Sequence, residues 1–288
     1  MCWRKQWVMR GYYVFLIVVF LIVCVLSGCA LDRQSTPEQI FRRAVAGMAG
    51  KEKVTFTGQT GIRADGGLPT TKQFKYRGKL QNHDEMIMQW GSAEAFRKQG
   101  DYVALKKDKS ESGVTHERFL RQKGKWIVLT SGDAPMAQNG LLNRFNPIQE
   151  LEELNTLNKS IRMEKGAARG TWVVRIEPEP ASAKRWLKER LMEEMNTINP
   201  QIGILKMQHT ETNRELQQKL SQVWKQSCED MNNQLEHSSV QAVYHLTIDR
   251  QTGLPLKLSS ECRISRQVTS EEVHQEALIT RVVFEDYK

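Results

Sequence analysis

The sequence lacks the residue spacings that mark common catalytic and nucleotide-binding motifs. It contains no G-x-S-x-G or S-x-x-K nucleophile motif, no phosphate-binding loop and no G-x-G-x-x-G fingerprint. Its six histidines are scattered, whereas a metal site needs three or four convergent ligands. We therefore expect a protein that is not an enzyme, with no catalytic residue, no metal and no cofactor.

Cysteine is scarce as well. Of the five cysteines, Cys2 and Cys24 lie within the first 28 residues and Cys29 follows directly. Only Cys228 and Cys262 remain, and both fall on apolar faces of the elements predicted below. They either pack as small hydrophobic side chains or form one disulfide in an oxidising compartment.

Acidic residues are missing from the first 28 positions. Three basic residues lie there within the first ten, and an apolar run from Tyr12 to Leu26 follows them. This is the pattern of an export signal, so we expect the rest of the chain on the extracytoplasmic face of the membrane. The alternative is an uncleaved transmembrane helix, although the run is shorter than the about 20 apolar residues that such a helix needs.

The apolar run ends in Leu26-Ser27-Gly28-Cys29, which resembles the bacterial lipobox. By this resemblance, Leu26, Ser27 and Gly28 are the signal-peptidase recognition residues, and cleavage falls before Cys29. The Cys29 thiol would then carry a diacylglycerol, whose acyl chains hold the protein on the cell membrane.

The balance of basic and acidic residues indicates which partners the protein could bind. Residues 29–288 contain 39 of the 42 Lys and Arg residues and all 33 Asp and Glu residues. This basic excess favours an anionic membrane surface or an anionic wall polymer, and the alternative is an ordinary solvated surface. No nucleic-acid motif accompanies the basic clusters, so we expect no nucleic-acid partner.

Hydrophobic periodicity predicts an α+β fold. Apolar residues at helical spacing predict helices over 36–50, 146–157, 181–198 and 213–237. Alternating apolar residues predict short strands between 53 and 130, at 161–164 and 172–177, and then from 242 to 284. Strands that follow one another through tight turns predict an antiparallel sheet with one covered face and one wet face.

Three segments follow from these patterns. We expect a signal peptide over 1–28, a polar tether over 29–35, and one domain over 36–288. That domain would contain a helical insertion at about 181–237, which we consider as a lid over the sheet.

The closing hairpin, from Tyr244 to Leu258, contains the turn Asp249-Arg250-Gln251-Thr252-Gly253. With the lipobox, the capped first helix and the run of amphipathic strands, it resembles Gram-positive and mycobacterial envelope lipoproteins. These have the lipoprotein-carrier half-barrel of the LolA/LolB-like type, including the LppX and LprG type. The resemblance implies a curved antiparallel sheet with helices against its concave side, enclosing an apolar cavity for acyl chains.

Two functions are considered. The first is a lipid-anchored, non-enzymatic protein that binds or carries a lipid or acylated ligand by hydrophobic burial. The alternative is an envelope interaction or sensor module that binds a membrane or cell-wall partner through the 181–237 helices. The candidate cavity residues, which in the alternative form an ordinary core, are Phe56, Tyr76, Trp90, Trp172, Leu246, Leu256 and Leu258.

Overall fold

The computed structural model describes residues 35–64, 74–92, 115–129, 144–197, 211–267 and 273–288. The expected signal peptide, the lipobox with Leu26, Ser27, Gly28 and Cys29, and most of the tether lie outside these residues. Their processing and lipidation therefore stay predictions. Within the described part of the chain, no helix is long and apolar enough to cross a membrane.

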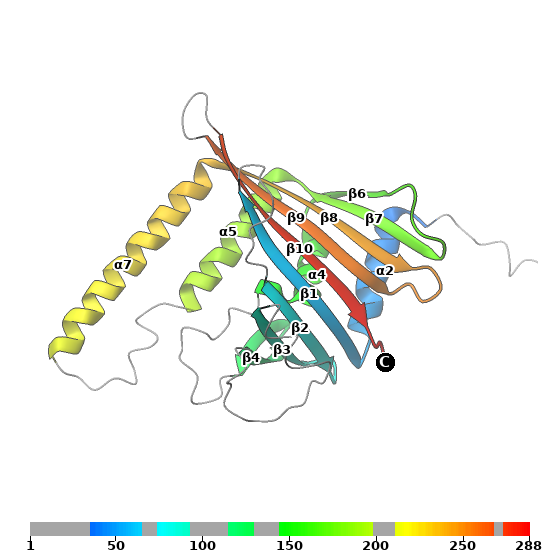
Figure 1. Ribbon diagram of the computed structural model, residues 1–288, viewed down its shortest axis with the longest axis horizontal. Coiled ribbons are helices and arrows are strands. Elements are labelled where there is room, and N and C mark those ends of the chain that lie inside the picture. The colour runs from blue at the N-terminus through cyan, green and yellow to red at the C-terminus, as the bar shows by residue number, and fades with distance from the viewer. Residues whose placement is uncertain (1–34, 65–73, 93–114, 130–143, 198–210, 268–272) are drawn as a thin grey trace, which may run out of the picture.

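The described residues form one ten-stranded antiparallel sheet (Figure 1) in the order β5-β4-β3-β2-β1-β10-β9-β8-β7-β6. Neighbours in sequence pair within each half, and the halves join where β1 pairs with β10. The strands are β1 (Lys53–Ala64), β2 (Phe74–Gln81), β3 (Glu85–Ser92), β4 (Thr115–Gln122), β5 (Lys125–Leu129), β6 (Lys159–Met163), β7 (Thr171–Pro178), β8 (Ser238–Asp249), β9 (Pro255–Gln267) and β10 (Val273–Glu285).

The described helices are α2 (Pro37–Ala49), α4 (Pro147–Thr156), α5 (Pro180–Thr197) and α7 (Glu211–Glu236). The expected capping box of α2 is present, because Thr36 and Gln39 each accept a hydrogen bond from the other's backbone N–H. Asn146 caps α4 by accepting from the N–H groups of Ile148 and Gln149. Both helices therefore begin where the sequence predicts.

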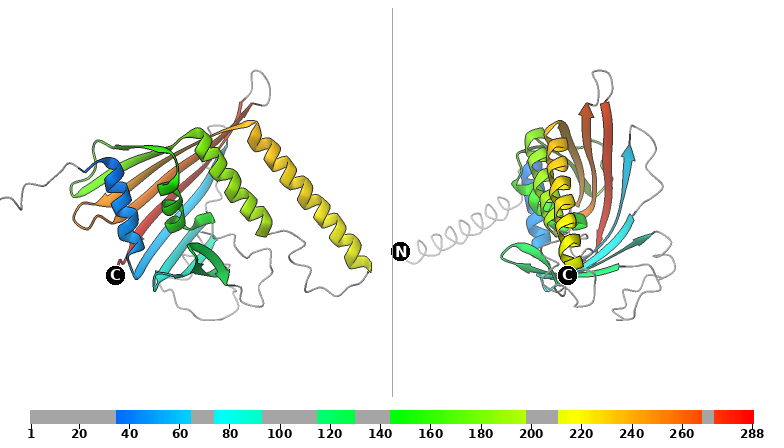
Figure 2. Two further views of the ribbon diagram at one scale, coloured as in Figure 1. Left: turned by 180° about the vertical axis from the view of Figure 1, so that it is seen from behind. Right: turned by 90° about the vertical axis from the view of Figure 1, so that its left-hand side faces the viewer.

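Helices α2, α4 and α5 lie on the concave side of the sheet (Figure 2). Alternate residues of each strand face them, and these residues form one hydrophobic core with α2 and α4. Two glycines admit large rings to this face: Gly78 is paired with Phe56, and Gly58 is paired with Tyr76. A Cβ at either glycine would overlap the opposing ring, so the close approach requires glycine there.

The predicted fold class is confirmed. The chain is α+β, with a curved antiparallel sheet, helices on its concave side and a long helical segment between β7 and β8. That segment comprises α5 and α7, and Figure 1 shows α7 extending away from the sheet. The strand expected near 102–105 lies outside the described residues.

Candidate functional site

The concave face has two sections, which differ in what lies over them. The first, here called the covered section, lies under α2 and α4. Its strand residues are almost inaccessible, with Phe56 at 1%, Met86 at 0% and Phe284 at 3% exposure. The helices supply Ile40, Phe41, Ala44, Val45, Met48, Ile148, Leu151 and Leu154 to the same core.

The open section comprises Ile62, Phe74, Trp90 and Leu278. Strand register places Ile62 opposite Leu278, and Phe74 opposite Thr60, on the concave side. The rings of Phe74 and Trp90 are in contact, with centroids 6.0 Å apart. Nevertheless, Ile62 is 48% exposed and Phe74 43% exposed. The apolar surface of the concave face thus continues beyond the part that the helices cover.

A cluster of polar side chains lies between the two sections, under α5. Glu150 of α4 accepts a hydrogen bond from the hydroxyl of Tyr244. Arg190 of α5 donates to the backbone carbonyl of Arg144 at 2.8 Å and lies 3.7 Å from Glu153. The indole N–H of Trp186 donates to the same Glu153 carboxylate at 2.7 Å. These contacts attach α5 to α4.

Burial changes the protonation of this cluster. The Glu150 carboxylate is enclosed by protein, and this burial raises its pKa to about 7, although the positive charge of Arg190 and the hydrogen bond from Tyr244 act in the opposite direction. Burial likewise raises the pKa of Tyr244 and Tyr76. It raises the pKa of the Cys262 thiol to about 11, which makes that thiol a poor nucleophile.

The space enclosed beneath α5 is small. Its volume is about 60 Å³, and it lies between Tyr76, Leu187, Arg190 and Tyr244. That is room for a few water molecules rather than for an acyl chain. Tyr76 stacks on Phe145 beside it, with centroids 5.4 Å apart. Protein side chains therefore largely fill the concave side at this point.

A wider groove of about 920 Å³ opens between strand β5 and the helices α4 and α5. Trp126, Arg121 and Glu152 line it, and Arg121 and Glu152 form an ion pair of 2.9 Å. Among the described residues, the buried indole N–H groups of Trp126 and Trp90 have no hydrogen-bond partner. Two buried donors on the concave face are therefore unsatisfied, and each lies beneath the accessible surface.

The predicted cavity residues separate into three groups. Phe56, Tyr76, Leu246 and Leu258 are buried in the core, which places them against protein. Trp90 and Trp172 are only partly buried, and Trp90 alone belongs to the open section. Leu256 lies at a register irregularity between β8 and β9 and outside the core cluster, whereas nearby Leu254 is buried. Binding at any of these residues stays a proposal.

The structure does not join the two remaining cysteines. Cys228 on α7 and Cys262 on β9 are both free thiols. Within the described ranges, no group of three or more His, Cys, Asp or Glu residues is placed to hold a metal ion.

Sequence reasoning missed the residues that distinguish this site. Ile62 and Phe74 alternate in phase with Phe56 and Tyr76, so the period-two pattern assigned them to the right face without showing their exposure. Glu150 and Arg190 give no local signal, because their proximity depends on how α4 and α5 approach each other.

No protein-family model matches the chain, and no curated protein matches it. Among solved structures, it is similar to lipovitellin, described for its lipid–protein interactions (9% identity, TM-score 0.34, 83% of this chain, 26% of that chain). It is also similar to a LolA superfamily protein from Nitrosomonas europaea (7% identity, TM-score 0.23, 88% and 93% covered). A third is an outer membrane lipoprotein-sorting protein domain from Vibrio parahaemolyticus (9% identity, TM-score 0.24, 87% and 91% covered).

The chain spans about a quarter of the length of the lipovitellin chain that it matches. These similarities concern the fold alone and identify no ligand.

Proposed function

We propose that this protein binds the acyl chain of a lipid or acylated ligand on the open section of the concave face. In this proposal no covalent chemistry takes place. A lipid on Cys29 anchors the protein to the extracytoplasmic face of the cell membrane, and the short tether keeps the open section near a source of acyl chains.

The observation that carries the proposal is the exposure of Ile62 and Phe74 on the inner side of the sheet. Isolated apolar residues on an outer surface are common, but these two continue the apolar surface of a core and adjoin Trp90 and Leu278. Covering such a surface with a hydrocarbon chain releases about 25 cal/mol for each Å² removed from water. An acyl chain needs only this apolar contact.

The polar groups beside the open section suit the other end of such a ligand. The Trp90 indole N–H, which has no partner among the described residues, lies on the same face as Phe74. Because this donor is buried, an ester or carboxyl oxygen would reach and satisfy it only after neighbouring side chains move. The open section therefore offers apolar contact at its surface and an unsatisfied donor beneath it.

The first experiment is native mass spectrometry with lipid extraction on the full chain purified from bacterial membranes. We expect a stoichiometric, non-covalent lipid in addition to any covalent modification of Cys29. The Ile62→Ser/Phe74→Ser variant should lose that lipid and remain folded, because both side chains are already exposed.

Val283→Ser is the matched control. Val283 lies on β10 and is 39% exposed, but register places it on the convex face, opposite Lys257 and Thr57. It should retain the lipid. Absence of lipid from the wild-type protein, together with no uptake of a photoreactive fatty acid into the open section, would contradict the proposal.

A second candidate function, binding another envelope protein, is favoured by α7. Its apolar stripe is buried at Cys228 and Leu235, but Leu216, Leu220 and Val223 are 55%, 48% and 63% exposed. Under this alternative, Leu220→Asp should abolish cross-linking to a membrane protein and Gln218→Asp should not. Equal cross-linking by both variants would contradict a role of α7 in binding another protein.

A further inference from the structure

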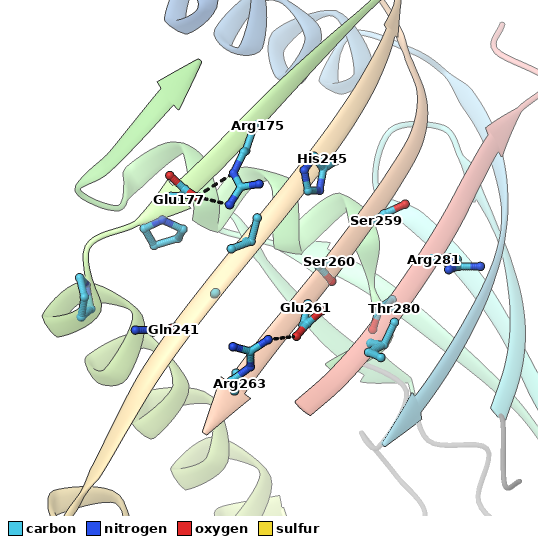
Figure 3. Close-up of a pocket in the computed structure, with 15 residues that line it drawn as sticks. Arg175, Glu177, Gln241, His245, Ser259, Ser260, Glu261, Arg263, Thr280 and Arg281 are labelled. Carbon is cyan, nitrogen blue, oxygen red and sulfur yellow. Dashed lines mark hydrogen bonds and ion pairs between the residues drawn. The ribbon is translucent and has the colours of Figure 1, made fainter. Parts of the chain in front are cut away.

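The convex face carries a groove that the acyl-binding proposal does not use. Its volume is about 700 Å³, and it crosses strands β7, β8, β9 and β10. Figure 3 shows Arg175, His245, Ser259 and Arg281 following one another in a line across these strands. Each of the four residues belongs to a different strand of the sheet.

Strand register extends this line in both directions. Arg175 is paired with Arg162 on β6 at one end, and Arg281 is paired with Gln59 on β1 at the other. Gln59 is paired in turn with Lys75 on β2. We call the whole line the basic row: Arg162, Arg175, His245, Ser259, Arg281, Gln59 and Lys75. It contains no acidic residue and spans about 29 Å at the usual spacing of about 4.8 Å between strands.

Acidic neighbours neutralise one end of the basic row. Arg175 donates to Glu177 at 2.7 Å, and Arg162 lies 3.6 Å from the same carboxylate. Glu164 lies 3.9 Å from Arg175 and 3.5 Å from His245. Glu261, also in the groove, accepts from Arg263 at 2.6 Å and from Arg63 at 2.7 Å. The groove is therefore balanced over β7 and β8, and on β9 the Glu261 carboxylate is occupied by two arginines.

The other end is not neutralised. Among the described residues, Arg281, Lys75 and Lys257 have no carboxylate within ion-pair distance, and register places all three on the convex face. Basic residues also predominate over the rest of the convex face. Its basic residues, which outnumber its acidic ones, are Lys53, Arg63, Lys75, Arg77, Lys79, Arg118, Lys125, Arg162, Arg175, Lys257, Arg263 and Arg281; the acidic ones are Glu85, Glu164, Glu177, Asp249, Glu261, Glu285 and Asp286.

We propose that the basic row binds a linear polymer of phosphate groups, which runs along the convex groove and continues over β1 and β2. Arg281 and Lys75, with Lys257 beside them, supply the uncompensated charge. Cations at regular strand spacing fit a partner whose anionic groups repeat along one direction, and each cation that pairs with a phosphate releases counterions from that partner. Arg175 is held in place by Glu177 and retains further N–H donors.

The recessed geometry favours a polymer over a flat bilayer. Ser259 is half-buried on the groove floor, and the Arg175 side chain is 28% exposed. A planar membrane surface would reach the rim of the groove and not these residues. The groove lining also contains no Phe, Tyr or Trp among the described residues. Nucleic-acid bases would therefore find no ring for stacking, which favours a phosphate polymer without bases.

The experiment measures binding of long-chain inorganic polyphosphate to the full chain, reconstituted in phosphatidylcholine vesicles, at several salt concentrations. We expect the logarithm of affinity to fall linearly with the logarithm of salt concentration. The Arg281→Gln/Lys75→Gln variant should weaken binding about tenfold or more. It should also reduce the salt slope by about two, because each of the two removed cations neutralises about one phosphate.

Arg118→Gln/Lys125→Gln is the matched control, because it removes the same charge from the same face, on β4 and β5, away from the row. It should leave affinity within about twofold. An equal loss of affinity in both variants would show that net charge, and not the basic row, determines binding. Binding to phosphatidylglycerol vesicles that depends on Arg281 and Lys75, without binding of polyphosphate, would overturn the polymer in favour of a membrane. These outcomes do not depend on Ile62 or Phe74.

Discussion

The covered and open sections of the concave face use the same strands, yet they differ in what lies over them. Phe56 and Ile62 both lie on β1 and face the same side, but Phe56 is 1% exposed and Ile62 48% exposed. Over the covered section, α2 and α4 contribute fully buried apolar side chains to a common core. Beside the open section, the contacts of α5 are largely polar and involve Trp186 and Arg190.

This difference shows how one sheet can combine stability with an available surface. The covered section is packed without exposed apolar side chains, so its energy comes from burial within the chain. The open section is apolar without being packed, so part of its burial is left for a ligand. The polar cluster around Glu150 and a cavity of about 60 Å³ lie at the boundary between the two sections.

The largest expected effect comes from removing one phenylalanine at the covered section and one at the open section. Phe41→Ala, in α2, removes a side chain with 0% exposure and should destabilise the protein by about 3–5 kcal/mol. Phe74→Ala removes a side chain with 43% exposure and should cost about 1 kcal/mol or less. Denaturant unfolding of the two variants measures both. Equal losses would remove the distinction between the sections.

The second test uses pH at the boundary. The Glu150 carboxyl has a pKa of about 7 in the folded protein and 4.5 ordinarily, so the folded state binds more protons between these values. Stability should therefore fall as pH rises from about 4.5 to about 7, by up to about 3 kcal/mol. Glu150→Gln should flatten this part of the stability profile, whereas Glu189→Gln, on the exposed side of α5, should leave it as it is. An unchanged slope in Glu150→Gln would contradict the assignment.

A third test concerns the close approach that admits Tyr76. Gly58→Ala places a methyl group against the Tyr76 ring and should cost about 1–3 kcal/mol. Combined with Tyr76→Leu, the same substitution should cost less than the sum of the two single changes, because the smaller side chain removes the overlap. A double-mutant cycle measured by unfolding gives the coupling, and strict additivity would show that Gly58 is not required by the ring.

The smallest effect is expected at the cap of α2, which holds this helix over the covered section. Thr36→Ala removes the side chain that accepts from the Gln39 N–H and should cost about 1 kcal/mol. Thr36→Asp retains an acceptor and should restore most of that stability. Thermal unfolding measures both variants, and a loss in Thr36→Asp as large as in Thr36→Ala would exclude the capping contribution.

The elements of the fold were predictable from local patterns. The helix predicted over 181–198 is observed as Pro180–Thr197, and the one over 213–237 as Glu211–Glu236. Caps, turn residues and apolar periodicity act over a few residues, so they can be recognised in the chain alone. The pairing of β1 with β10 was not predicted, because residues such as Phe56 and Phe284 are distant in sequence and no local pattern relates them.

The site was less predictable than the fold. Period-two alternation assigned Phe56, Tyr76, Leu246 and Leu258 to the concave face, but it could not say that helices would bury them. The basic row was not predicted either. Arg175, His245 and Arg281 are ordinary polar positions on separate strands, and only the strand register aligns them.

The sequence by itself determined the α+β class, the bounds of the helices and the face of each strand that is apolar, because these follow from residue spacing along the backbone. Only the tertiary structure decided which apolar residues are covered, how close Glu150 lies to the charge of Arg190 and which cations form one row. These properties depend on distances between segments, and the packing of helices on a curved sheet sets those distances.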